Sequence, residues 1–185
     1  MSLAPSNMLE LGTKIIDFTL PNVIDNKPLK LSEYAKEKPI VLAFICNHCP
    51  YVKHIMDEFV AIANDYTEKG FAFVAISSND VSTHPDDAPE KMKELALSRA
   101  FNFPYCYDES QQAAKDYDAA CTPDFYCFDT QHKLAYRGRF DGATPGNNLA
   151  VTGEDLIVAM DAVLAGKAVD KEQKPSIGCN IKWKS

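Results

Sequence analysis

Two cysteines, Cys46 and Cys49, are separated by two residues and directly follow an apolar run over residues 40–45. Two thiols at this spacing lie within reach of a disulfide across one tight turn. The thiolate, and not the thiol, attacks a disulfide, so such a site must stabilise a negatively charged sulfur. The pattern predicts a dithiol–disulfide exchange site at the junction of a strand and a helix.

The residues around the dithiol suggest how the anion is stabilised. We expect the first thiol to lie at a helix N-terminus, where unpaired N–H groups and the helix dipole favour a negative charge. Pro50 suits the opening turn of that helix, because the N–H that it lacks would have no partner there. We expect Cys46 to be the exposed nucleophile and Cys49 to be the shielded thiol that resolves the mixed disulfide.

A helix terminus alone is a weak source of stabilisation for the thiolate. Lowering a thiol pKa from about 8.5 to about 6.5 takes roughly 2.7 kcal/mol, whereas a helix N-terminus supplies up to about 2 kcal/mol. His48 lies between the two cysteines, and as an imidazolium it would favour the thiolate directly. Lys53 and His54, one turn further on, are weaker candidates for the same role. Because stabilising the reduced form makes a couple more oxidising, we expect a less reducing potential than that of a plain reductase.

The composition narrows the class of protein. The 185 residues carry a formal net charge of −7 and are 46% hydrophobic, which fits one soluble domain with a real core. No basic cluster suggests nucleic-acid binding, and no apolar run of about 20 residues suggests a membrane span. No signal peptide is visible, so we expect a cytoplasmic protein whose six cysteines are mostly reduced. Cys106 and Cys127 lie in apolar runs and are expected to be buried.

Strand-like and helix-like segments alternate along the chain, which indicates an α/β fold. Ser32 is a candidate cap for a short helix, and Thr152 with Asp155 resembles a capping box. We expect strands within 17–32 (two, around a turn) and at 40–45, 71–77, 103–107, 124–129 and 133–140, and helices at about 33–36, 50–68, 89–100, 110–118 and 152–165.

Three features resemble the thioredoxin-fold redoxin family, which includes the TlpA/ResA-type oxidoreductases and the AhpC/TSA peroxiredoxins. They are the strand–CNHCP–helix unit at 46–50, the Thr122-Pro123 pair before a strand, and the hairpin region that begins with residues 17–20. The resemblance implies a thioredoxin-like fold, with a central mixed β-sheet flanked by helices and an extra N-terminal β-hairpin. It divides the chain into an extension (1–11), a thioredoxin-like domain (12–166) and a C-terminal tail (167–185).

The resemblance also implies a site and its substrates. The peptide bond before Pro123 would be cis, with Pro123 against the dithiol and the Thr122 backbone facing the substrate chain. Substrates would be disulfide-containing proteins or small thiols, with a thiol reductant as electron donor and no cofactor. Thioredoxins carry a buried acid and a tryptophan where this chain has Ile40 and Ile45, so a strong thioredoxin-like reductase is not expected.

A thiol peroxidase is the first alternative. Peroxiredoxins place a proline and a hydroxyl residue before the peroxide-reacting cysteine. Pro39 stands at the right distance from Cys46, but Ala43 replaces the hydroxyl residue. Arg137 or Arg139 could partly substitute for the missing donor.

A zinc-binding or interaction module without turnover is the second alternative. Cys46, His48 and Cys49, with one further Cys or His, could bind zinc tetrahedrally, although the other cysteines are scattered and we expect no metal. Two more thiols stay open. Cys121 is either a third redox thiol or an ordinary buried cysteine, and Cys179 could fold back onto the dithiol.

Overall fold

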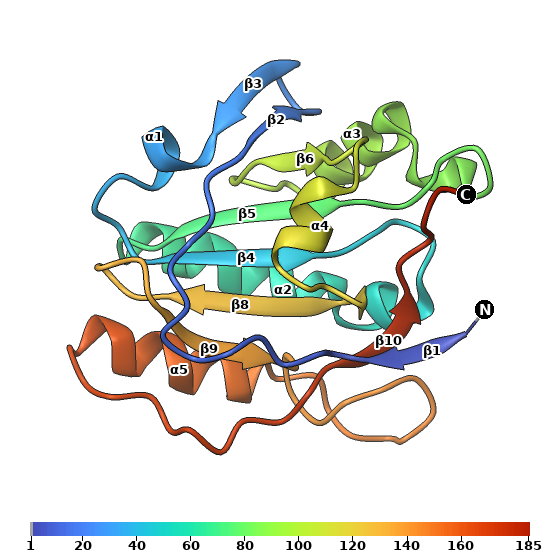
Figure 1. Ribbon diagram of the computed structural model, residues 1–185. Helices are drawn as coiled ribbons and strands as arrows, with labels where there is room; N and C mark the ends of the chain where they lie inside the picture. The colour runs from blue at the N-terminus through green and yellow to red at the C-terminus, as the bar shows by residue number, and fades with distance from the viewer. Residues whose placement is uncertain (1) are drawn as a thin grey trace.

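A mixed β-sheet forms the centre of the molecule in the computed structural model, which describes residues 2–185 (Figure 1). Its seven strands run in the order β3-β2-β6-β5-β4-β8-β9. A second sheet of three strands, in the order β1-β10-β7, lies beside the first. The strands are β1 (Leu3–Pro5), β2 (Thr19–Asn22), β3 (Lys27–Lys30), β4 (Ile40–Phe44), β5 (Ala72–Ser77), β6 (Tyr105–Tyr107), β7 (Cys121–Thr122), β8 (Asp124–Phe128), β9 (Leu134–Gly138) and β10 (Ile177–Asn180).

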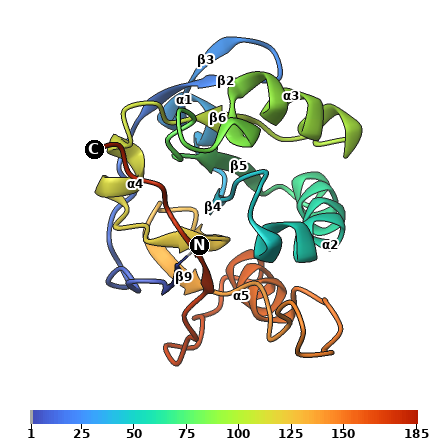
Figure 2. The same cartoon turned by 90° about the vertical axis from the view of Figure 1, so that its right-hand side faces the viewer.

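Helices cover both faces of the large sheet. Figure 2, which views the sheet close to end-on, shows α2, α3 and α5 on one side and α4 on the other. The helices are α1 (Leu31–Ala35), α2 (Pro50–Glu68), α3 (Pro89–Ser98), α4 (Gln112–Asp116) and α5 (Glu154–Leu164), with a short 3-10 helix η1 (Pro85–Asp87). Among residues 2–185, no helix is long and apolar enough to cross a membrane.

Two hydrophobic cores follow from the alternation of side chains along the strands. In β4, Val41 and Ala43 point into the core beneath α2, α3 and α5, whereas Leu42 and Phe44 point into the core beneath α1 and α4. A strand buried on both faces reads as a continuous apolar run, and β4 is paired on both edges, with β5 and β8. The sequence prediction of a central strand at 40–45 is confirmed.

The pairing of β4 with β5 decides where the chemistry-bearing loops lie. The two strands are parallel, so their carboxyl ends meet at the same edge of the sheet. The turn that carries the dithiol follows β4, and residues 78–88 follow β5. These two segments therefore face each other across that edge.

The predicted α/β, thioredoxin-like fold class is confirmed, including the extra hairpin, because β2 pairs with β3 and β6 in the central sheet. Both cap predictions were wrong. α1 begins at Leu31, and Ser32 is held from outside the helix by the carboxylate of Asp17. α5 begins after Gly153, and Asp141, in place of Asp155, accepts the N–H group of Thr152 together with that of Gly153.

The chain ends form structure that the sequence patterns did not indicate. β10 lies between β1 and β7, with Cys179 opposite both Leu3 and Thr122. β1 has three residues and β10 has four, so neither is long enough to show a clear alternating pattern. β1 and β10 therefore join the two predicted chain-end segments, the 1–11 extension and the 167–185 tail, beside the central domain. Met1 lies outside the described residues.

Candidate functional site

The dithiol lies at the end of β4 and the start of α2. Cys46 comes two residues after the strand, and Cys49 is the N-cap of the helix, with Pro50 at its first position. Pro50 thus has the predicted place. The expectation that Cys46 occupies the helix N-terminus was wrong, because the turn of Asn47 and His48 separates it from α2 and leaves Cys49 at the N-terminus.

Both sulfurs are buried and in contact with Thr122. Cys46 Sγ lies 3.3 Å from Thr122 Oγ1, and Cys49 Sγ lies 3.3 Å from the Thr122 carbonyl oxygen. The peptide bond between Thr122 and Pro123 is cis, as expected. Cys46 was expected to be exposed, but both cysteines are 0% exposed. This burial comes from β7, which carries Thr122, and from the hydrophobic core around the N-terminal end of α2.

The third contact of the dithiol comes from the C-terminal tail. Cys179 Sγ lies 2.8 Å from Cys49 Sγ, and Cys179 is itself buried. The backbone of Cys179 pairs with that of Thr122. The tail has therefore folded back onto the dithiol, and β10 occupies the strand edge that the resemblance assigned to a substrate chain.

The surroundings shift the pKa values of the two thiols in opposite directions. A hydrogen bond from Cys46, a contact with Cys179 and nearby backbone N–H groups lower the pKa of Cys49 to about 5, against the effect of its burial. Burial, the hydrogen bond to Cys49 and the charge of Asp87 raise the pKa of Cys46. The expectation that Cys46 carries the stabilised thiolate was wrong, because the helix terminus and the donors surround Cys49.

His48 is paired with a carboxylate that sequence reasoning did not identify. His48 Nδ1 lies 2.6 Å from Asp87 Oδ2, and the Asp87 side chain is fully buried. This contact uses Nδ1 and leaves Nε2 for another group. Nε2 is buried and has no hydrogen-bond partner among the described residues. Ligand atoms of Cys46, His48 and Asp87 all lie within 4.8 Å of one another. The three residues form a thiol–imidazole–carboxylate cluster.

Asp87 also fixes the turn that carries the dithiol. Its Oδ1 accepts the backbone N–H groups of Asn47 at 2.7 Å and His48 at 3.1 Å, and its Oδ2 accepts Asn79 Nδ2 at 2.8 Å. A buried carboxylate needs such donors to offset its desolvation. The sequence signal for Asp87 was its polar loop, which follows a strand predicted to be buried. The sequence alone did not show which acid in that loop points inward.

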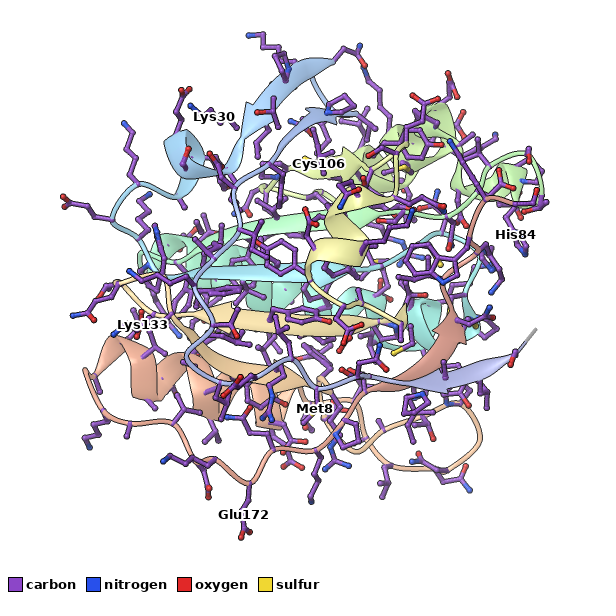
Figure 3. The ribbon with its side chains drawn as sticks, viewed as in Figure 1. Met8, Lys30, His84, Cys106, Lys133 and Glu172 are labelled. Atoms are coloured by element: carbon purple, nitrogen blue, oxygen red, sulfur yellow. The ribbon has the colours of Figure 1, made fainter. Side chains whose placement is uncertain are left out.

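A second histidine extends this cluster toward solvent. The ring of His84 lies 4.6 Å from the ring of His48, and its burial and the nearby His48 lower the pKa of His84. Figure 3 shows His84 at the outer edge of the molecule, on the loop after β5. A zinc site built on both cysteines and His48 gains no support from this arrangement, since the third ligand in the cluster is Asp87 and not Cys49.

The remaining candidates have other positions. Lys53 and His54 are exposed on α2, with no ion pair to the dithiol in the described structure. Cys121 pairs with Asn180, and its sulfur contacts the Pro123 carbonyl oxygen at 3.9 Å. Arg137 binds Leu9 and Gln173, and Arg139 binds Asp155. Cys106 and Cys127 are buried, as predicted.

Comparison with known proteins decides the family. The AhpC/TSA family profile matches residues 11–137, which is most of the chain. The chain belongs to the AhpC/TSA family. A search of curated proteins gives no match. The family match and the fold together identify this AhpC/TSA chain as a thioredoxin-like redoxin, as its sequence motifs indicated.

Solved structures support the same assignment. An uncharacterized conserved protein from Geobacillus kaustophilus is 52% identical, with a TM-score of 0.97 over 100% of this chain and 97% of that chain. A hypothetical protein from Sinorhizobium meliloti 1021 is 45% identical, with a TM-score of 0.95 over 98% of both chains. A thiol:disulfide interchange protein from Chlorobium tepidum TLS is 17% identical, with a TM-score of 0.64 over 83% of this chain and 97% of that chain, which shows the shared fold.

Proposed function

We propose that this AhpC/TSA protein is a thiol–disulfide oxidoreductase, with Cys46 as the attacking thiol and Cys49 as the resolving thiol. The observation that carries the proposal is the arrangement of two neighbouring thiols beside an imidazole that is held by a buried carboxylate. His48, held by Asp87, lies beside Cys46, and Cys49 has a pKa of about 5. The substrates are protein or small-molecule disulfides, and a thiol reductant of a reducing compartment such as the cytoplasm restores the dithiol.

The first step needs a base because the pKa of Cys46 is raised. His48 is the base that takes the proton of Cys46, since one of its ring nitrogens lies within 4.8 Å of Cys46 Sγ and its Nδ1 is held by Asp87. The Cys46 thiolate then attacks a substrate disulfide, forms a mixed disulfide and releases one substrate thiolate. His48 can return the proton to that leaving sulfur. Since Cys46 is buried, a substrate gains access through a local opening beside the half-buried Asn47–His48 turn.

The second step uses the thiolate that the site already holds. Cys49 attacks the Cys46 sulfur of the mixed disulfide, closes the Cys46–Cys49 disulfide and releases the second substrate thiolate. In the mixed disulfide the hydrogen bond from Cys46 is lost, but the contact with Cys179 and the nearby backbone N–H groups still lower the pKa of Cys49. A thiol reductant then reduces the Cys46–Cys49 disulfide and completes the cycle.

Insulin reduction in the presence of dithiothreitol tests the proposal. We expect the wild-type protein to accelerate insulin precipitation and Cys46→Ser to abolish the acceleration. His48→Gln should lower the rate at pH 7 by about 100-fold, the usual contribution of a general base. Cys106→Ser, which lies on the opposite face of the sheet, is the matched control and should retain activity. Equal rates for Cys46→Ser and wild type would overturn the proposal.

A peroxidase activity is the second candidate, favoured by the family and by one contact. The hydroxyl of Thr122, 3.3 Å from Cys46 Sγ, supplies next to the thiol a donor that Ala43 does not provide. Peroxide consumption with dithiothreitol, measured on the same variants, separates the two functions. A peroxidase loses this consumption in both Cys46→Ser and Thr122→Val, whereas an exchange enzyme shows no peroxide turnover at all.

A further inference from the structure

The contact between Cys49 and Cys179 has no role in the two-cysteine cycle described above. The two sulfurs lie 2.8 Å apart although they are 130 positions apart in the chain. Two independent features hold them there. Cys49 is fixed as the N-cap of α2, and Cys179 is fixed by pairing with Thr122 on one side and Leu3 on the other.

We propose that Cys179 is a third redox residue, which exchanges with the Cys46–Cys49 disulfide to give a Cys49–Cys179 disulfide. The inference rests on the proposed function, because that cycle supplies the Cys46–Cys49 disulfide. In the step, the Cys179 thiolate attacks Cys49 Sγ, the Cys46–Cys49 bond breaks and Cys46 leaves as a thiolate. Cys179 loses one proton and Cys46 takes one up, so the two-electron oxidation stays within the protein and needs no further oxidant.

The charges around Cys179 favour exchange in the oxidised state. Burial, the hydrogen bond to Cys49 and the charge of Cys49 raise the pKa of Cys179 to about 12 in the reduced protein. Once Cys49 is part of a disulfide, it carries no charge and accepts no such hydrogen bond. The charge of Lys182, which lowers the pKa of Cys179, then acts against burial alone. Cys179 is therefore a better nucleophile once the dithiol has been oxidised than it is in the reduced protein.

The exchange gives the protein two alternative disulfides, Cys46–Cys49 and Cys49–Cys179. After the exchange, Cys46 is a thiol again, next to His48, and can attack a second substrate disulfide. The oxidised bond is then held under the tail, between α2 and β10. A protein with three such cysteines stores one oxidation while its attacking thiol stays available.

Peptide mapping of the oxidised protein tests this exchange. Trypsin should release Cys49 within residues 37–53 and Cys179 within residues 172–182, because the Lys38–Pro39 and Lys174–Pro175 bonds resist cleavage. We expect Cys46→Ser, oxidised with one equivalent of diamide, to give a 37–53/172–182 linked peptide as its main disulfide. Cys121→Ser combined with Cys46→Ser should give the same linked peptide, since the sulfur of Cys121 contacts the Pro123 carbonyl oxygen and takes no part in the proposed link.

Wild-type protein gives the second readout. The protein is treated with one equivalent of a small-molecule disulfide. The linked peptide should then be present in wild type and absent in Cys179→Ser. That variant should hold only the Cys46–Cys49 disulfide, within residues 37–53. Absence of the 37–53/172–182 link in both wild type and Cys46→Ser would overturn the role of Cys179. That result leaves the proposed function standing if wild type still reduces insulin, whereas loss of insulin reduction with an intact link would overturn the proposed function alone.

Discussion

At the scale of the residue, the groups around each sulfur shift the pKa values of the two cysteines in opposite directions. Cys49 lies at the helix terminus with Cys46 and Cys179 against it, whereas Cys46 faces the Asp87 charge. We predict that the reduced protein shows one thiolate titration near pH 5, measured by absorbance at 240 nm between pH 3 and 9. The titration should be missing in Cys49→Ser.

The control for this titration is Cys106→Ser. Burial raises the pKa of Cys106 to about 12, so this thiol is silent in the pH range measured. A low titration that persists in Cys49→Ser and vanishes in Cys46→Ser would reverse the assignment.

At the scale of the element, β10 closes the site through a close backbone approach to β7. A Cβ added at Gly178 would lie 2.0 Å from the Thr122 carbonyl oxygen, so no larger residue fits without separating the two strands. Overpacking of this kind costs about 1–3 kcal/mol. We predict that Gly178→Ala loosens β10 and speeds maleimide labelling of Cys49 about tenfold or more.

The matched variant for the strand is Gly142→Ala. A Cβ there would meet its nearest neighbour, Leu149 Cδ1, at 3.5 Å, which is ordinary contact. Labelling of Cys49 should stay at the wild-type rate in this variant. If Gly178→Ala also labels at the wild-type rate and keeps slow amide exchange at Cys179, β10 does not shield the dithiol.

At the scale of the whole molecule, a buried acid makes folding stability depend on pH. Asp124 follows the cis peptide and is fully buried, with Tyr126 Oη donating to Oδ2 at 3.0 Å and no partner for Oδ1 among the described residues. Burial raises the pKa of Asp124 from 3.8 to about 7. The stability that comes from the neutral acid is complete below pH 4 and is lost as the pH rises through 7.

We predict that Asp124→Asn removes most of this loss. Between pH 4 and pH 8 the free energy of unfolding of the variant, relative to wild type, should rise by about 4 kcal/mol. Guanidinium unfolding at the two pH values measures the difference. Glu58→Gln, an exposed acid on α2, is the control and should track wild type. A constant difference between Asp124→Asn and wild type at all pH values would show that Asp124 is not neutral in the folded protein.

Local sequence determined a large part of the scaffold. The apolar run at 40–45, Pro50 at the opening turn of the next helix and the turn within 17–32 each specify an element through contacts within a short stretch. α2 accordingly spans the predicted residues 50–68, and the hairpin falls on β2 and β3. The same local signals identified Cys46, His48, Cys49, Thr122 and Pro123 as candidates, because the spacing of thiols and the Thr-Pro pair are properties of neighbouring residues.

Only the tertiary structure decided how the site is charged and closed. Asp87 reaches His48 because β4 and β5 are parallel neighbours, and Cys179 reaches Cys49 because β10 pairs with β7. Burial of Cys46 and Asp124 likewise depends on segments far apart in the chain. A pKa responds to every group within a few ångströms, wherever that group stands in the chain. The sequence therefore identified the two candidate sulfurs, and packing set the different surroundings that shift their pKa values.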